Sequence, residues 1–157
     1  MPTLSEVRRG LDSYLAEIEE EYYLNWAGLK EELSTTPIIE RYGWLFTREV
    51  AELARKLEGR GGRLLEMFAV SGMLDSAVRE LTDRLETELS KKVIQVAGEQ
   101  LPFRLAYVKV NNEPRRERRA EIYRGILAAV DEVNPILEER TEILHRKSRE
   151  LGFESYA

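Results

Sequence analysis

The sequence lacks cysteine and has a single histidine, His145, among its 157 residues. Disulfides, thiol nucleophiles and Cys-ligated zinc sites are therefore excluded, and a catalytic zinc site with two or three histidine ligands cannot be built from this chain. No apolar run approaches the roughly 20 residues that span a bilayer, and the N-terminal residues include no signal-peptide hydrophobic region. We expect a cytoplasmic protein with no membrane partner.

Basic residues are also fewer than acidic residues. The chain has 24 Lys and Arg against 29 Asp and Glu, a net charge of −5, which argues against nucleic acid as a partner. Charged residues make up 34% of the chain, compared with roughly 25% in average globular proteins. Thermolabile residues are few, so the composition resembles that of thermophilic proteins. The hydrophobic fraction of 43% is enough for the core of a single helical domain over residues 1–157.

The first segment has a clear helix start and a helical period. Thr3-Leu-Ser-Glu6 matches a capping box, and apolar residues then recur about every 3.6 residues from Leu4 to Leu33. These features predict one helix over that range. The stretch 34–37, Ser-Thr-Thr-Pro, is expected to end it and to start a short helix with Thr36 as its N-cap. A second helix is expected from about Thr47 to Leu57.

Residues 58–62, Glu-Gly-Arg-Gly-Gly, predict a hinge or a tight connection between helices. One long helix is expected after them, because apolar residues step by three and four from Leu64 to Leu89. Its end is predicted near Lys92, where a basic side chain suits the helix dipole.

The period changes after this helix. Residues 93–96 and 99–103 predict two short strands around Gly98, with Pro102 limiting the second strand to an edge. Leu105 to Val110 are expected to continue in extended form.

From Arg115 to Leu151 the chain again has a helical pattern, with a kink or a new helix start at Asn134-Pro135 and a C-cap at Gly152. The fold class predicted from these elements is mainly α, an antiparallel bundle of long helices with one short β-hairpin near residues 93–103.

Few residues are candidates for chemistry. His145 could act as a general base, but a boundary histidine without function is the more common case. Glu142 and His145 form a single Glu-x-x-His, whereas dinuclear carboxylate sites in helix bundles need that motif twice, so Glu138 and Glu142 are interpreted as part of a solvated face. We therefore predict no catalytic residue and no metal ligand in this chain.

The densest basic stretch is 115–119, Arg-Arg-Glu-Arg-Arg. Glu113, Glu117 and Glu121 are interleaved with it, which favours a salt-bridged helix start over a phosphate site. The glycines of 58–62 do not form a phosphate-binding loop, because no Gly-Lys-Ser/Thr ending follows them.

Three segments together resemble a known family. They are Glu-Tyr-Tyr-Leu-Asn-Trp (21–26), Asn-Glu-Pro-Arg-Arg-Glu-Arg-Arg (112–119) and Arg-Glu-Leu-Gly-Phe-Glu-Ser-Tyr (149–156). With the order of long helices and the intervening hairpin, the chain resembles the N-terminal helical region of thimet oligopeptidase and oligoendopeptidase F type zinc peptidases over nearly its whole length.

The resemblance implies a non-catalytic part of a longer peptidase. In this family a His-Glu-x-x-His helix binds zinc and activates water, and the N-terminal helices help to wall a channel that admits short peptides. His145 is followed by Arg146-Lys147-Ser148, so no catalytic residue transfers to this sequence. The implied cofactor is zinc, held only by a separate catalytic portion, and the chain alone is expected to be inactive.

Two partners are compatible with these observations. One is the catalytic portion of a peptidase, which the resemblance implies. The other is a second copy of the chain, since apolar residues recur every seven positions along the last helix. The expected interface is formed by Leu137, Leu144, Leu151 and Tyr156. In the second case the chain would be a stand-alone helical interaction protein that forms a homo-oligomer.

Overall fold

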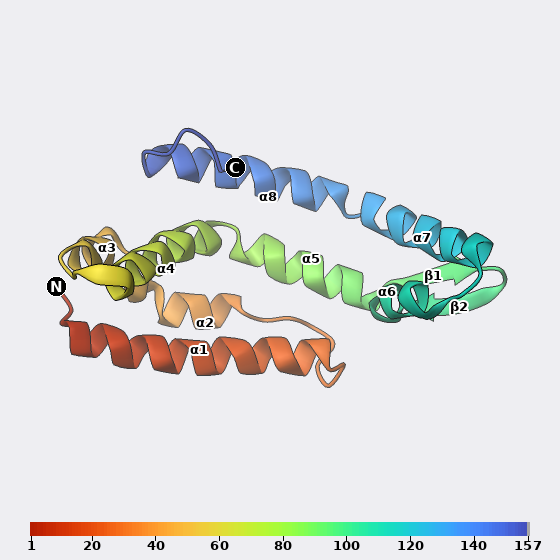
Figure 1. Ribbon diagram of the computed structural model, residues 1–157, viewed down its shortest axis with the longest axis horizontal. Helices are drawn as coiled ribbons and strands as arrows, with labels where there is room; N and C mark the ends of the chain where they lie inside the picture. The colour runs from red at the N-terminus through yellow and green to blue at the C-terminus, as the bar shows by residue number, and fades with distance from the viewer. Residues whose placement is uncertain (157) are drawn as a thin grey trace.

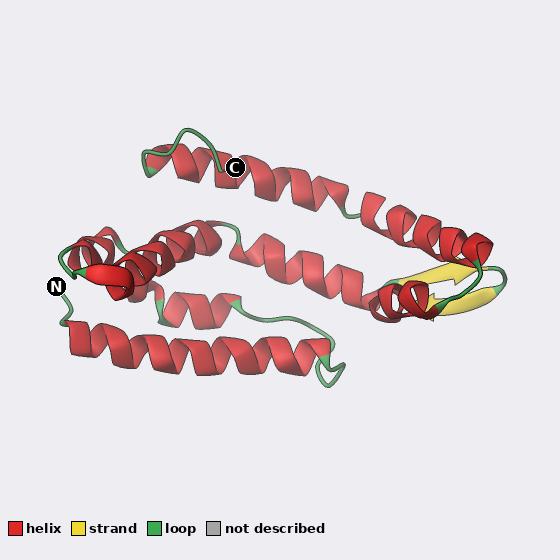
Figure 2. Ribbon diagram, in the orientation of Figure 1, coloured by secondary structure: helices red, strands yellow, loops and turns green. Residues whose placement is uncertain are grey.

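A computed structural model describes residues 1–156 of the chain. Over these residues it has eight α-helices, one 3₁₀ helix and one antiparallel pair of strands, which confirms the predicted fold class. The helices lie in tiers (Figures 1 and 2): α1 forms one edge, α4 and α5 the middle, and α7 and α8 the opposite edge, while α6 and the hairpin lie at one end.

The first tier contains α1 (Leu4–Trp26) and α2 (Thr36–Arg41). The predicted capping box is confirmed, since the Thr3 hydroxyl accepts from the Glu6 amide and the Glu6 carboxylate accepts from the Thr3 amide. The prediction that this helix runs to Leu33 is wrong. Gly28, with φ +74°, forms a Schellman ending in which the Leu29 amide donates to the Leu24 carbonyl.

The middle tier begins after the 3₁₀ helix η1 (Gly43–Leu45) with α3 (Arg48–Arg55), which is capped by Thr47 and lies within the range predicted for a helix. It continues through α4 (Gly59–Ala77) and α5 (Arg79–Lys91).

The glycine-rich residues 58–62 provide a tight connection between α3 and α4, because α4 already starts at Gly59. The single long helix predicted here is wrong: Val78, with φ −124° and ψ 11°, leaves the helical region and separates α4 from α5.

The hairpin pairs β1 (Val93–Val96) with β2 (Glu99–Pro102). Ala97 and Gly98 both have positive φ, 50° and 84°, as a two-residue turn of type I′ requires. The strands predicted around Gly98 are therefore confirmed.

The extended conformation predicted for Leu105–Val110 is wrong, because these residues belong to α6 (Phe103–Asn112). Phe103, Ala106 and Val110 lie on one helical face, and this face packs against the hairpin and α7. The alternation of apolar residues suggested a strand, but burial of this helical face favours the helix.

The last tier consists of α7 (Arg116–Asp131) and α8 (Asn134–Glu150). Pro135 lies in the first turn of α8, so Asn134-Pro135 marks a new helix start. Gly152 ends α8 as predicted, with φ +95° and a hydrogen bond from the Phe153 amide to the Ser148 carbonyl.

Buried apolar residues form three clusters. The first joins α1–α4, the second joins the hairpin to α6 and α7, and the third joins α5 to the start of α8. Compact domains usually have one contiguous core with smaller satellites. The tiers of this chain are therefore joined by three separate apolar clusters and not by one continuous core.

Candidate interaction surface

The accessible surface of the chain is large for its mass. It measures 10,170 Å², whereas a compact monomer of 18.2 kDa exposes about 8,100 Å² by the general scaling of area with mass. The excess is therefore roughly 2,000 Å². An interface of standard size buries about 800 Å² on each partner, so the excess is large enough for a stable contact.

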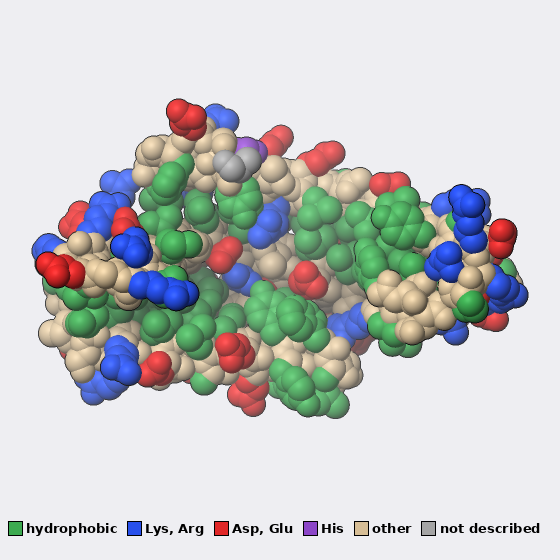
Figure 3. Space-filling model, viewed as in Figure 1, with side chains coloured by type: hydrophobic (Ala, Val, Ile, Leu, Met, Phe, Trp, Pro, Cys, Tyr) green, Lys and Arg blue, Asp and Glu red, His purple; other side chains and the backbone are tan. Residues whose placement is uncertain are grey.

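Much of this exposed surface is apolar. Tyr23, Trp26 and Leu29 at the end of α1 are each more than 60% exposed. A second exposed group lies on α6 and α7: Leu105, Tyr107, Val108, Tyr123 and Leu127. Figure 3 shows hydrophobic side chains reaching the surface over the end of α1 and between the tiers of helices. Contiguous apolar patches on a protein surface mark contacts with other molecules.

A groove of about 670 Å³ is lined by residues of α2, α4, α5 and α8. Phe46, Met73 and Ile143 supply apolar walls, while Glu139 and Arg79 supply charge. The molecule is visibly hollowed between these helices in Figure 3.

Polar contacts hold one wall of this groove in place. The Asp83 carboxylate on α5 accepts from the Thr35 amide at 2.9 Å, from the Thr36 amide at 2.8 Å and from both threonine hydroxyls. We call this set the Asp83 clamp. It caps the N-terminus of α2 from a different helix, because Thr35 makes no side-chain cap of its own.

Arg79, one turn before Asp83, is only 8% exposed. Its guanidinium donates to the Tyr22 hydroxyl at 2.8 Å and to the Thr35 hydroxyl at 3.1 Å. Together with Asp83, it ties α5 to the first tier. Sequence reasoning missed both residues; the available signal was their i, i+4 spacing on a helix, together with consecutive threonines that need an acceptor.

The end of α1 is fixed in a similar way. Asn25 is buried, and its side-chain amide donates to the carbonyls of Lys30 and Glu31. Glu21, also buried, accepts from the Lys30 ammonium at 2.6 Å and from the Ser34 amide at 2.6 Å. The segment that follows α1 is therefore positioned by polar groups of α1 itself.

The residues expected to form an interface differ in their environments. Leu144 is 1% exposed and lies in the interior of the chain, and Leu137 packs against the α5–α8 cluster. Leu151 lines a shallow groove with Phe153, and Tyr156 is 46% exposed. The structure therefore leaves Tyr156 as the most accessible of the four, and their role as an interface stays a prediction.

His145 contacts the C-terminal segment, which folds back along α8 (Figure 1). Its Nδ1 accepts from the Tyr156 amide at 3.2 Å, and the two rings meet edge to face. Among the described residues, no ion pair joins His145 to Glu138 or Glu142. Across residues 1–156, no group of three or more His, Asp or Glu side chains is arranged to hold a metal ion.

Two arginines of the basic stretch at the start of α7, Arg115 and Arg118, are paired with acidic residues. Arg118 bonds to Glu99 at 2.6 Å and contacts Glu113, and the Glu113 carboxylate also accepts from the Arg115 amide. This backbone hydrogen bond, followed by the bond from the Arg115 side chain, lowers the pKa of Glu113. The salt-bridged helix start interpreted from the sequence is thus what the structure has.

Comparison with known proteins gives no match, whether to family models, to curated proteins or to solved structures. The resemblance of the sequence to zinc oligopeptidases accordingly stays a prediction. Within the described residues, none of the helices combines the length and apolar character that a membrane crossing needs.

Proposed function

We propose that this chain is the non-catalytic helical part of an oligopeptidase-like zinc enzyme, in which it forms part of the wall of a channel for short peptides. The observation that carries the proposal is the excess of roughly 2,000 Å² of exposed surface. A second portion that covers this surface would complete the packing between the tiers.

In this proposal the metal and the chemistry belong to the other portion. Zinc would be held there by a His-Glu-x-x-His helix, a motif that has no counterpart around His145. The residues of this chain would shape the channel and limit what enters it from one side. α2 would be held there by the Asp83 clamp, and α1 by the hydrogen bond from Arg79 to Tyr22.

The test compares the 157-residue chain with the product of the same gene extended beyond codon 157. We expect the chain to contain no stoichiometric zinc and to cleave no quenched fluorescent peptide, whereas the extended product cleaves peptides in a chelator-sensitive way. The chain should also bind an apolar dye that the extended product binds less. Chelator-sensitive cleavage by the 157-residue chain would overturn the proposal.

The excess surface also favours a second candidate, a stand-alone helical protein that assembles with a second copy. Light scattering over a range of concentrations separates the two, because self-association gives a mass that doubles or more. Tyr156→Arg is the suitable interface variant, since Tyr156 is exposed, whereas a charge at Leu144 would disrupt the interior. A native stop codon after Ala157 together with a stable dimer would favour this candidate over the first.

A further inference from the structure

A second hollow lies away from the groove described above. It has a volume of about 290 Å³ and opens where the end of α1 meets α5 and α6. We call it the aromatic pocket and define it by Trp26, Glu86, Leu89, Phe103, Arg104 and Tyr107. Its volume is at the lower end of ligand sites in proteins, which suits one amino-acid side chain better than a large ligand.

Two aromatic walls face the pocket from different helices. Trp26, 67% exposed at the end of α1, contacts Tyr22 with ring centroids 5.2 Å apart and ring planes inclined at 44°. On α6, Tyr107 meets Phe103 edge to face at 6.0 Å. Trp26 and Tyr107 thus present large ring surfaces to solvent while their neighbours hold them in place.

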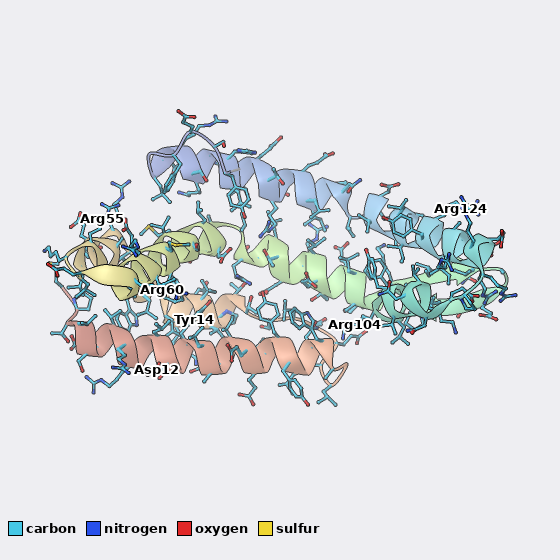
Figure 4. All side chains as sticks on the ribbon, viewed as in Figure 1. Asp12, Tyr14, Arg55, Arg60, Arg104 and Arg124 are labelled. Atoms are coloured by element: carbon cyan, nitrogen blue, oxygen red, sulfur yellow. The ribbon has the colours of Figure 1, made fainter. Side chains whose placement is uncertain are left out.

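One of the two charged side chains of the pocket, Arg104, is hydrogen-bonded to the end of α1. The Arg104 guanidinium donates to the main-chain carbonyl of Asn25 and, at 3.1 Å, to the Asn25 side-chain oxygen. Figure 4 shows Arg104 between the end of α1 and α6. The last turn of α1 contains no basic residue, so Arg104 provides the positive charge that suits the negative end of this helix dipole.

The other charge has no counterpart. Glu86, half-buried on α5, makes no ion pair or hydrogen bond with its side chain in residues 1–156. A carboxylate beside exposed aromatic faces attracts an organic cation, because the carboxylate is negatively charged and the ring quadrupole gives each ring face a negative potential. A cationic group can therefore pair with the one carboxylate of the pocket, which has no partner in residues 1–156.

We infer that the aromatic pocket binds the side chain of an arginine or lysine in a peptide. The guanidinium or ammonium would lie against Trp26 or Tyr107 and pair with the Glu86 carboxylate, while the methylene groups contact Leu89 and Phe103. The choice of a peptide as the ligand class rests on the proposed function; the choice of a cationic side chain rests on the pocket itself.

The test uses Ac-Ala-Arg-Ala-NH₂ and its neutral analogue with citrulline in place of arginine. In a Trp44→Phe background Trp26 is the only tryptophan, so its fluorescence reports binding directly. We expect saturable binding of the arginine peptide with a Kd on the order of 1 mM. The citrulline peptide and the Glu86→Gln variant should each bind about three- to fivefold more weakly, as expected for one partly exposed ion pair with a cation–π contact.

Glu88→Gln is the matched control, because Glu88 lies on the same helix and pairs with Arg84 outside the pocket. Its affinity should equal that of the parent, and circular dichroism should show the same helix content in all variants. Equal binding of the arginine and citrulline peptides, no effect of Glu86→Gln, or no saturation by about 20 mM would each overturn the inference. These results would leave the zinc, cleavage and mass measurements unchanged, so failure of the pocket is distinguishable from failure of the proposed function.

Discussion

The Asp83 clamp gives the sharpest test of how the first tier is attached. In Asp83→Ala the Thr35 and Thr36 amides and the buried Thr35 hydroxyl lose their common acceptor. A buried donor left without a partner costs about 1–3 kcal/mol, and water can reach part of this site. We therefore expect the free energy of unfolding to fall by about 3–5 kcal/mol.

Asp83→Asn separates charge from geometry. The asparagine oxygen can still accept from the amides, but neutral hydrogen bonds are roughly half as strong, so the expected loss is about 1–2 kcal/mol. Urea unfolding monitored by circular dichroism measures both variants. Since the total stability of most domains is about 5–15 kcal/mol, the alanine variant should be visibly less stable at room temperature.

Asp12→Ala is the control for loss of a carboxylate. Asp12 is exposed on the outer side of α1 (Figure 4) and should change stability by no more than about 0.5 kcal/mol. If Asp83→Ala and Asp12→Ala shift the unfolding midpoint equally, then the clamp does not hold α2 to α5, and the explanation of the first tier is incorrect.

Three smaller changes test other parts of the structure, two of them by urea unfolding and the third by an NMR titration. Gly72→Ala should lower the free energy of unfolding by about 1–3 kcal/mol, because its Cβ would lie 1.9 Å from Cδ1 of Phe46; an unchanged midpoint would contradict this packing. Gly61→Ala, with open space at the same atom, should raise it by about 0.5–1 kcal/mol, and a loss would argue against a helix there. The Thr3 amide and then the Thr3 hydroxyl lower the pKa of Glu6 below 4.5, so this stabilisation is complete above pH 4.5 and is lost as pH falls through the folded-state pKa. Thr3→Ala should raise the Glu6 pKa part of the way towards 4.5 in an NMR titration, and no change would refute the capping box.

Local signals in the sequence predicted the starts of α1 and α8, the hairpin and the final cap. The Thr3–Glu6 box, the turn at Gly98 and the ending at Gly152 each depend on a few neighbouring residues. Such features can be read from sequence because their hydrogen bonds join residues close in the chain.

The errors arise where distant contacts decide the structure. The face of Phe103 and Ala106 is helical because α7 and the hairpin cover it. The separation of α4 from α5 at Val78 has no glycine or proline signal; it allows Arg79 to reach Tyr22 and Thr35 in the first tier. Neither contact is encoded by the local period of apolar residues.

The candidate sites were harder to predict for the same reason. Glu86 and Trp26 are 60 positions apart in the sequence but line the same pocket. Helical periodicity assigns each residue to a face of its helix, but it does not predict which other helix packs against that face. The spacing of Leu137, Leu144 and Leu151 did indicate a packed seam, but Leu144 fills it against the chain's own helices.

The exposed surface follows from the way in which the tiers are joined. The first tier is attached to α5 through the carboxylate of Asp83 and the guanidinium of Arg79, and hydrogen bonds fix position without burying much apolar area. The apolar residues are divided among three clusters, and the groove lined by α2, α4, α5 and α8 stays open beside them. At about 25 cal/mol per Å², covering roughly 1,000 Å² of apolar surface, an area equal to half of the excess, contributes about 25 kcal/mol before the losses of association. A partner that fills the groove therefore has enough driving force to bind, and this is the physical basis of the proposal that the chain is one part of a larger assembly.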